Sequence, residues 1–358
     1  MELSSKERSK LFSIFENLKE EKKLASEKGV SGATPKEVLL IDGYNTFIRC
    51  FAAIPTLNED GLHTGGISGF FKSVGYALKL FKPDRCVIIF DGPGGSMKRR
   101  KIFPDYKAHR KTTVRLNRIY ETNSELGDEQ ESLKKQLQRI VGYIQYLPVN
   151  MLSLDNVEAD DTIAHLALDY FKNWKVKVMS SDKDFLQLVS DRVNAWSPTK
   201  KKVYAPQDVL AEYGISANNF VYYRILDGDK SDNIDGIKGC GLKTIIKALP
   251  FLADTQLASL KQIYDYCDTH KDGLKVYQSI LSNWSVVERN YALMQLTESQ
   301  VTSFAQLHIK ECLDNPIPKL NRFEFSKLIT QDKLWNNLPN YGSWLTECFG
   351  KLDHLIVS

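Results

Sequence analysis

Acidic residues mark both ends of one predicted helix–strand unit in the middle of the chain. The first cluster is Glu158, Asp160 and Asp161, and the second is Asp182 and Asp184. The first cluster opens an apolar run with helical spacing, which predicts a helix over 158–172 with Asn156 as its N-cap. The second follows a short strand expected over 176–179, at the strand end where open α/β sheets place their sites. Helix capping alone explains the first cluster but gives no reason for the second.

Two further acids each follow an apolar run of strand length. Asp42 ends the run 37–41, and Asp91 ends the run 86–90. Residues 65–80 between them have the pattern of a crossover helix, which predicts β-α-β units and a mostly parallel sheet. An Asp-Gly pair after a strand is usually only a turn. Three parallel strand ends on one edge would nevertheless bring Asp42, Asp91 and the second acidic cluster together.

A dense basic run, residues 98–111, begins shortly after Asp91. Its bases and aromatic residues include Arg99, Arg100, Phe103, Tyr106, Lys107, Arg110 and Lys111. A run of charge is commonly only a solvated surface, but aromatic residues between the bases are typical of a site for single-stranded nucleic acid. We therefore expect this run to bind phosphate. The polar stretch 112–132 that follows is expected to become ordered only with ligand.

A Gly-rich segment, residues 234–249, leads into a predicted helix. Its candidate backbone-binding residues are Gly236, Lys238, Gly239, Gly241, Lys243 and Thr244. Loops that open onto a helix present backbone amides to phosphate, although the spacing of a P-loop is absent. An EF-hand that starts at Asp227 would have Asp232 where glycine is needed and Lys238 where glutamate is needed. The remaining interpretation is a helix–loop–helix that holds a nucleic-acid backbone without reading its bases.

The composition excludes several classes of protein. The chain has 48 Lys and Arg against 44 Asp and Glu, and the distribution of charge matters more than the net value of +4. No apolar run is long enough to span a membrane, and the charged N-terminus does not read as a signal peptide. The six cysteines have no paired spacing, which indicates a reduced, cytoplasmic protein.

The acidic motifs together form an ordered set. It consists of Asp42, Phe90-Asp91, Glu158-Ala-Asp160-Asp161, Ser181-Asp182-Lys-Asp184 and Gly228-Asp229-Lys-Ser-Asp232-Asn. With this set and the Gly-x-Gly segment after it, residues 37–250 resemble the 5′-nuclease (flap endonuclease) superfamily. The turn after Trp196 and the chain length are most similar to the phage RNase H branch, 5′→3′ exonucleases that remove RNA primers and flaps in DNA replication.

The resemblance implies a PIN-like α/β fold with a mostly parallel central sheet flanked by helices. It adds a helical arch over about residues 96–146, a helix–three-turn–helix, and a helical C-terminal region. The expected domains are an N-terminal helical extension and linker at 1–36, the nuclease domain at 37–227, and the helix–three-turn–helix with the C-terminal region at 228–358.

The resemblance also implies two divalent metal ions, Mg²⁺ that Mn²⁺ can replace. Around the first it places Asp42, Asp91, Glu158, Asp160 and Asp161, with Asp182 shared or close by, and around the second it places Asp184, Asp229 and Asp232. Two ions about 4 Å apart can activate a water and stabilise the leaving oxygen. Lys107 and Arg99 would contact the scissile phosphate beside Asp91 and Asp182, and Tyr106 would stack on the terminal nucleotide. The loop at 236–241 would bind duplex backbone and a K⁺ ion.

The implied substrates are branched or 5′-flapped DNA and RNA/DNA hybrid, cut by a monomer. Implied partners are replication proteins such as a single-strand-binding protein or a sliding clamp. Three alternatives stay open: a PIN-type ribonuclease, which would lack the helix–loop–helix after residue 228; a non-catalytic branched-DNA-binding protein; and a calcium-binding or scaffold module, which the strand-end positions of the acids disfavour.

Overall fold

The computed structural model describes residues 36–108, 116, 126–298 and 301–357. The chain divides into two compact units, Met1–Lys36 and Glu37–Ser358, and the second carries every helix and strand named below. The helix predicted near the N-terminus lies outside the described residues, as do residues 109–115 and 117–125 of the predicted arch.

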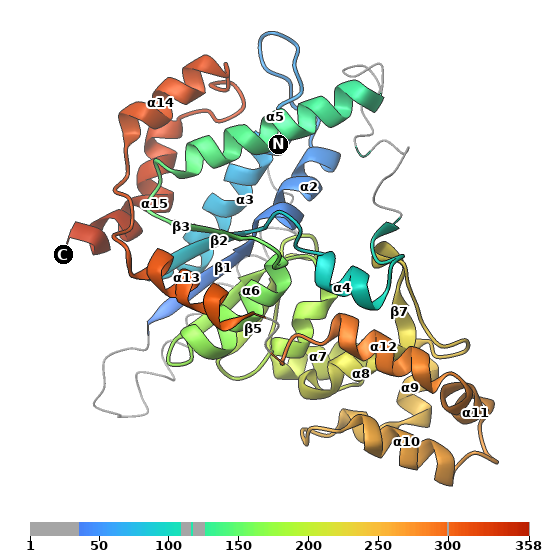
Figure 1. The fold of residues 1–358 in the computed structure, drawn as a ribbon. Helices are drawn as coiled ribbons and strands as arrows, with labels where there is room; N and C mark the ends of the chain where they lie inside the picture. Colours follow the sequence, from blue (N-terminus) through green and yellow to red (C-terminus); the bar gives the residue numbers. More distant parts are fainter. Residues whose placement is uncertain (1–35, 109–115, 117–125, 299–300, 358) are drawn as a thin grey trace, which may run out of the picture. The chain divides into compact units, whose positions relative to one another are not determined.

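A six-stranded sheet forms the centre of the second unit (Figure 1). In spatial order its strands are β3 (Asn150–Leu154), β2 (Arg85–Asp91), β1 (Glu37–Asp42), β4 (Lys175–Met179), β5 (Val193–Ser197) and β6 (Lys202–Tyr204). Strand β1 pairs in parallel with both β2 and β4, and β6 alone among the six is antiparallel. The central strands are buried apolar runs, as a sheet covered on both faces requires. The predicted mostly parallel sheet is confirmed.

Helices cover both faces of this sheet (Figure 1). One face carries α2 (Gly43–Ala53), α3 (Gly65–Phe81), α5 (Leu126–Ile144), α14 (Arg322–Gln331) and α15 (Tyr341–Val357). The other carries α6 (Ala159–His165) and α13 (Ser303–Asp314). On that second face, Leu40 and Ile89 of the sheet share a core with Ile163 of α6 and Ile309 of α13. The helices thereby fix the position of the strand ends that carry the acids.

Six further helices surround a second core beyond β6. They are α7 (Pro206–Tyr213), α8 (Phe220–Asp227), α9 (Leu242–Ala248), α10 (Leu260–Thr269), α11 (Lys275–Ser282) and α12 (Trp284–Met294). Leu186 and Phe220 lie in one core with Ile237 and Val287. Because the core continues across residue 228, the predicted domain boundary at this position does not separate two compact units.

One predicted helix differs from the structure at its ends, and another helix was not predicted. The predicted helix over 158–172 is α6 followed by a π-helical turn, Leu166–Tyr170. Its N-cap is Glu158, because Asn156 sits in a preceding turn with a φ of 61°. Helix α2 was not predicted at all. It starts directly after Asp42, whose carboxylate accepts a hydrogen bond from the Asn45 amide at 3.0 Å and caps the helix.

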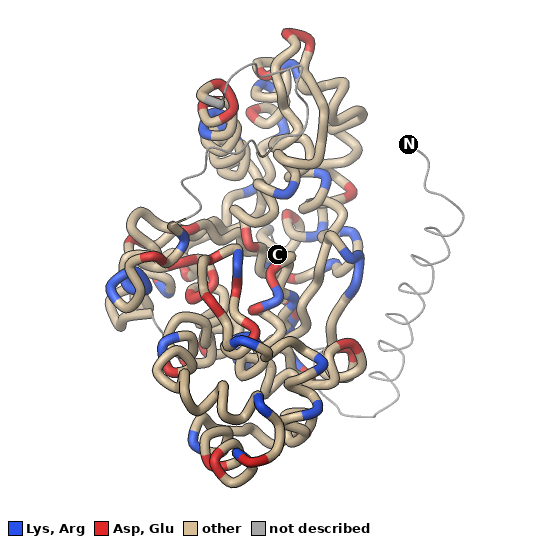
Figure 2. Tube along the Cα trace, turned by 90° about the vertical axis from the view of Figure 1, so that its right-hand side faces the viewer, with Lys and Arg blue, Asp and Glu red and all other residues tan. Residues whose placement is uncertain are grey.

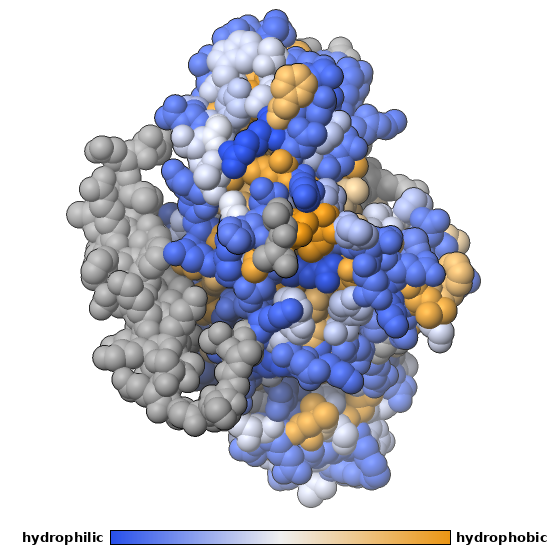
Figure 3. Space-filling view, turned by 90° about the vertical axis from the view of Figure 1, so that its left-hand side faces the viewer, coloured by the Kyte–Doolittle hydropathy of each residue, from blue (hydrophilic) through white to orange (hydrophobic). Residues whose placement is uncertain are grey.

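The C-terminal region is helical, as predicted, and its last helix packs on the body of the protein. Leu345 and Phe349 of α15 are fully buried, and α15 contacts α3. The face of the molecule drawn in Figure 3 is mostly hydrophilic with small separate apolar patches. Within the described residues, no helix is both long and apolar enough to cross a membrane.

Candidate active site

The sheet brings acids from three strand ends to one edge. Asp42 closes β1 and Asp91 closes β2, and Asp182 follows β4 after two serines. These strands are neighbours in the order β2, β1, β4 and run in parallel. Burial, together with the charges of Asp91 and Asp182, raises the pKa of Asp42 to about 7. Ser180 donates a hydrogen bond to Asp42 Oδ2 at 3.0 Å and fixes the orientation of this carboxylate.

Helix α6 adds acids to the same edge. Asp91 Oδ1 accepts a hydrogen bond from the Ala159 amide at 2.7 Å, so the end of β2 holds the start of α6. Burial raises the pKa of Asp160 well above its usual range, and the nearby charges of Asp182 and Asp42 act in the same direction. Asp42, Asp91, Asp160 and Asp182 are therefore close enough to repel one another.

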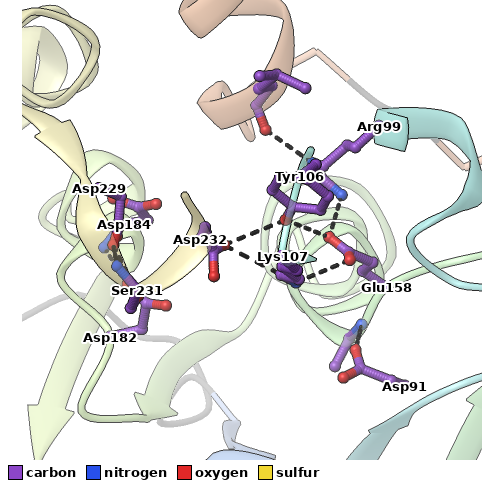
Figure 4. Close-up of polar contacts among 12 residues, drawn as sticks. Asp91, Arg99, Tyr106, Lys107, Glu158, Asp182, Asp184, Asp229, Ser231 and Asp232 are labelled. Carbon is purple, nitrogen blue, oxygen red and sulfur yellow. Dashed lines mark hydrogen bonds and ion pairs between the residues drawn. The ribbon is translucent and has the colours of Figure 1, made fainter. Parts of the chain in front are cut away.

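A second group of acids forms on the side of α8. Asp184 lies in a 3₁₀ turn, Lys183–Leu188, that Asp182 caps by accepting a hydrogen bond from the Asp184 amide at 2.8 Å. Burial and the charge of Asp182 raise the pKa of Asp184 to about 7. Asp229 follows α8, and Arg224 of α8 bonds both acids. Figure 4 shows this group on one side and Glu158 with Asp91 on the other, with Asp232 between them.

Arg99 of α4 (Met97–Ile102) is buried among acids and not exposed to a substrate. Its guanidinium is 2.6 Å from Glu158, forms two hydrogen bonds with Asp161, and donates to the carbonyl of Leu293. These bonds direct the guanidinium inward, and the contact between Arg99 and a phosphate stays a prediction. Asp161, predicted as a metal ligand, likewise has both oxygens bonded to Arg99.

Tyr106 is also buried, and the stacking on a nucleotide that we expect from the sequence stays a prediction. Its side chain is 2% exposed and belongs to the core around α8. Its hydroxyl lies 3.0 Å from Glu158 Oε2 and 3.2 Å from Asp232 Oδ2. The Tyr106 hydroxyl thus connects the two groups of acids.

Lys107 lies between the same two acids. Its ammonium donates to Glu158 Oε1 at 2.8 Å and is 3.9 Å from Asp232 Oδ2. Its backbone has a φ of 56°, and its amide donates to the carbonyl of Asp232 at 2.9 Å. Burial would raise the pKa of Glu158, but Lys107 and Arg99 more than offset this and hold that pKa below its usual range. Figure 2 shows acidic and basic positions alternating through the middle of the molecule.

The rest of the basic run is only partly described. Arg100 is exposed, and its Nε donates to the Tyr106 carbonyl at 3.3 Å. Arg110 and Lys111 lie outside the described residues.

The Gly-rich loop connects α8 to α9 by way of the short strands β7 (Gly228–Asp229) and β8 (Ile234–Asp235). A Cβ on Gly236 would lie 2.2 Å from the Asp227 carbonyl oxygen, so only glycine fits there. Gly239 has a φ of 89°, in the region that favours glycine. Lys238 and Lys243 are exposed, Thr244 is half-buried, and Gly241 is the N-cap of α9. Phosphate binding by this loop stays a prediction.

The donor chemistry of the site fits a hard divalent cation. Carboxylate oxygens are the ligands that Mg²⁺ prefers. Burial, and in second place the charges of neighbouring acids, raise the pKa values of Asp42 and Asp184, and a bound cation would offset both effects. Within the part of the chain that is described, no three His, Cys, Asp or Glu side chains group closely enough to hold a metal ion as they stand. Lysine and arginine side chains neutralise several of the acids instead.

Sequence reasoning missed Arg224 and Ser180, which orient predicted site acids. The signal for Arg224 was a single cation in the otherwise apolar helix that precedes Asp229. Ser180 gave no comparable signal, because a serine after a strand is common in turns.

Comparison with known proteins identifies relatives over most of this fold. Residues 37–214 match the family model of the 5′-3′ exonuclease N-terminal resolvase-like domain. A 5′-3′ exonuclease from Aquifex aeolicus is 34% identical over 216 residues, which are 60% of this chain and 69% of that protein. DNA polymerase I from Bacillus caldotenax is 34% identical over 239 residues, which are 64% of this chain and 25% of the polymerase. The chain thus spans only a quarter of the polymerase.

Solved structures share the fold at lower sequence identity. The D15 flap endonuclease of bacteriophage T5, solved with DNA and metal ions, is 18% identical with a TM-score of 0.59, over 83% of this chain and 99% of that chain. Flap endonuclease-1 from Methanococcus jannaschii is 19% identical with a TM-score of 0.50, over 90% and 93% of the two chains.

Proposed function

This chain belongs to the 5′-3′ exonuclease family, and we propose that it is a structure-specific 5′ nuclease that hydrolyses phosphodiester bonds in DNA. The observation that carries the proposal is the meeting of Asp42, Asp91 and Asp182 at neighbouring ends of parallel strands. Carboxylates gathered in this way repel one another unless cations neutralise them. Divalent ions held by such a group are the usual means of phosphodiester hydrolysis.

Two metal ions would be shared among the acids. Asp42, Asp91, Asp160 and Asp182 would hold the first, and Asp184, Asp229 and Asp232 would hold the second. When bound, the ions supply an activated water and stabilise the leaving oxygen. We propose Mg²⁺ as the natural ion because every donor is a carboxylate oxygen. We also propose K⁺ at the Gly-rich loop.

The side chains of the protein would position the substrate and shape the acid groups. Lys107, which lies between Glu158 and Asp232, would contact the scissile phosphate, because an ammonium on a flexible stem can exchange one anionic partner for another. Arg99 would hold Glu158 and Asp161 in place instead of touching the substrate. The exposed Lys238 and Lys243 would hold the duplex through its phosphates.

The substrates we propose are branched or 5′-flapped DNA and RNA/DNA hybrid, processed as primers or flaps in replication and repair. The protein would work as a monomer in the cytoplasm, beside a single-strand-binding protein or a sliding clamp. The family relation and the exposed loop lysines support a nucleic-acid substrate that the protein binds through the phosphates of its backbone.

The test is cleavage of a 5′-labelled flap by the wild-type chain and by Asp182→Asn, with and without Mg²⁺. We expect Asp182→Asn to reduce Mg²⁺-dependent cleavage by roughly a hundredfold or more. The fold should persist, because an amide oxygen can still accept the hydrogen bond of the Asp184 amide. Asp191→Asn is the matched control. Asp191 is an exposed acid that precedes β5, so it lies at the edge of the sheet opposite to the site acids.

Near-normal cleavage by Asp182→Asn would contradict the assignment of the site. Absence of Mg²⁺-dependent cleavage by the wild-type chain would contradict the proposed function, and binding of the flap without cleavage would then favour a branched-DNA-binding protein. Cleavage of single-stranded RNA alone would favour a PIN-type ribonuclease.

A further inference from the structure

Arg224 is a buried cation in the last turn of α8. Its Nε donates to Asp184 Oδ1 at 2.6 Å, and its Nη2 donates to Asp229 Oδ2 at 2.5 Å. Its Nη1 donates to the carbonyl oxygen of Gly228 at 3.1 Å. One guanidinium therefore joins the turn after β4, helix α8 and the loop after α8, and Figure 4 shows the two acids that it bonds lying side by side.

Hydrogen bonds fix the orientation of both acids that Arg224 contacts. Asp184 accepts from Arg224 through Oδ1. Asp229 accepts from Arg224 through Oδ2, and its Oδ1 accepts from the amide and hydroxyl of Ser231 at 2.7 Å each. Arg224 therefore sets the positions of two carboxylates that come from separate segments of the chain.

We propose that Arg224 is a positioning residue that sets Asp184 and Asp229 as a pair for the second divalent ion of the proposed nuclease site. The inference rests on the proposed function for the identity of that ion. The planar guanidinium presents several N–H donors in fixed directions and so can orient two carboxylates at once. A lysine ammonium is a point charge and cannot reproduce this geometry.

A positioning role and a purely electrostatic role of Arg224 predict opposite changes in metal affinity when this residue is replaced. A cation beside the acids repels a divalent ion, so removal of its charge alone should tighten metal binding. If Arg224 acts by position, its removal frees two carboxylates from separate chain segments to move apart, and metal binding should weaken. The sign of the change in affinity therefore separates the two roles.

The experiment measures Mn²⁺ binding to the full chain without DNA, by electron paramagnetic resonance or calorimetric titration. It compares the wild-type chain with Arg224→Gln and Arg224→Lys. We expect the weaker Mn²⁺ site to lose about tenfold in affinity in both variants, the size usual for loss of a residue that orients a metal ligand. The Mg²⁺ concentration for half-maximal flap cleavage should rise by a similar factor.

Arg192 provides a matched control. It is a half-buried arginine that also bonds another segment of the chain, by donating to the carbonyls of Phe171 and Trp174. Arg192→Gln and Arg192→Lys should leave the Mn²⁺ isotherm of the wild-type chain unchanged. A loss of affinity in the Arg192 variants as large as in the Arg224 variants would overturn the specific role of Arg224.

Unchanged or tighter Mn²⁺ binding in folded Arg224 variants overturns the inference. If Arg224→Gln does not fold, the Arg224→Lys isotherm decides, and loss of cooperative unfolding in both variants also overturns a purely positioning role. A wild-type chain that binds Mn²⁺ but leaves the flap uncut contradicts the proposed function, while the isotherms still decide the role of Arg224. A wild-type chain that binds no Mn²⁺ overturns both.

Discussion

At the scale of single residues, Tyr106 connects the two acid groups through one hydroxyl. Tyr106→Phe removes the donor shared by Glu158 and Asp232 and leaves both acceptors with fewer bonds in a buried place. We expect the free energy of unfolding to fall by about 1–3 kcal/mol, the usual cost of such a loss. Denaturant titration of the metal-free protein measures this change.

The control for Tyr106 is Tyr264→Phe, because Tyr264 is 41% exposed, against 2% for Tyr106. This variant should keep the stability of the wild-type chain. If Tyr106→Phe were equally stable, the hydroxyl would not be buried between the acids, and the stacking role predicted from the sequence would be favoured again.

The positions of the site acids could be predicted from sequence patterns, but the residues that form hydrogen bonds with them could not. Asp42, Asp91 and Asp182 could be brought together because parallel strands end at a common edge, which is a rule of topology. The burial of Arg99 and Tyr106 could not be predicted, since bases and aromatic residues look the same in sequence on a solvated arch and in an ion-paired core. Their roles depend on the approach of α6 and α12, which no local pattern encodes.

At the scale of elements, α15 packs on α3 at a glycine. A Cβ on Gly75 would lie 2.7 Å from Trp344 Nε1 and 2.9 Å from Cys348 Sγ, so α15 must shift to accept it. We expect Gly75→Ala to lower the free energy of unfolding by about 1–3 kcal/mol through overpacking. Thermal or denaturant unfolding measures the loss.

Gly142→Ala is the matched control, because a Cβ at Gly142 in α5 meets nothing within 4 Å. It should stabilise the protein by roughly 0.5–1 kcal/mol, since alanine is the better helix former. A Gly75→Ala variant as stable as Gly142→Ala would show that α15 is not seated on α3 in this way.

Elements with strong periodic patterns could be predicted, and those set by capping could not. The strands β1 and β2 contain continuous apolar runs, and β4 is apolar apart from its lysines; all three were found within one residue of their ends. Helix α2 was missed because Asp42-Gly43 has the composition of a turn, while the Asp42 carboxylate in fact caps a helix. The π-helical turn after α6 has no sequence signal that we can identify.

At the scale of the whole molecule, the two halves of the chain share contacts at the site. The Lys107 amide donates to the Asp232 carbonyl, and Asn233 Nδ2 donates to the Asp105 carbonyl at 2.9 Å. The start of the predicted arch is thereby tied to the turn before the Gly-rich loop. The candidate site is therefore built from chain segments on both sides of residue 228.

The whole-molecule charge gives the last prediction. A net charge of +4 on 358 residues provides little long-range attraction for DNA, so binding should depend on local cations such as the exposed Lys238 and Lys243. Each lysine that neutralises a phosphate contributes about 0.9 to the slope of log K against log salt concentration on B-DNA. We expect Lys238→Ala and Lys243→Ala each to lower that slope by about 1 and to weaken binding equally on flaps of different sequence.

The measurement is fluorescence anisotropy with labelled flaps of two sequences, in Ca²⁺ or without divalent ions and at several salt concentrations. Lys310→Ala is the control, because Lys310 is also an exposed lysine, on α13, a helix that contacts β3 and lies apart from α9 in Figure 1. Its slope should equal that of the wild-type chain. If the two loop variants also kept the wild-type slope, the Gly-rich loop would not bind the duplex. Another surface of the protein would then have to hold the DNA at the site acids.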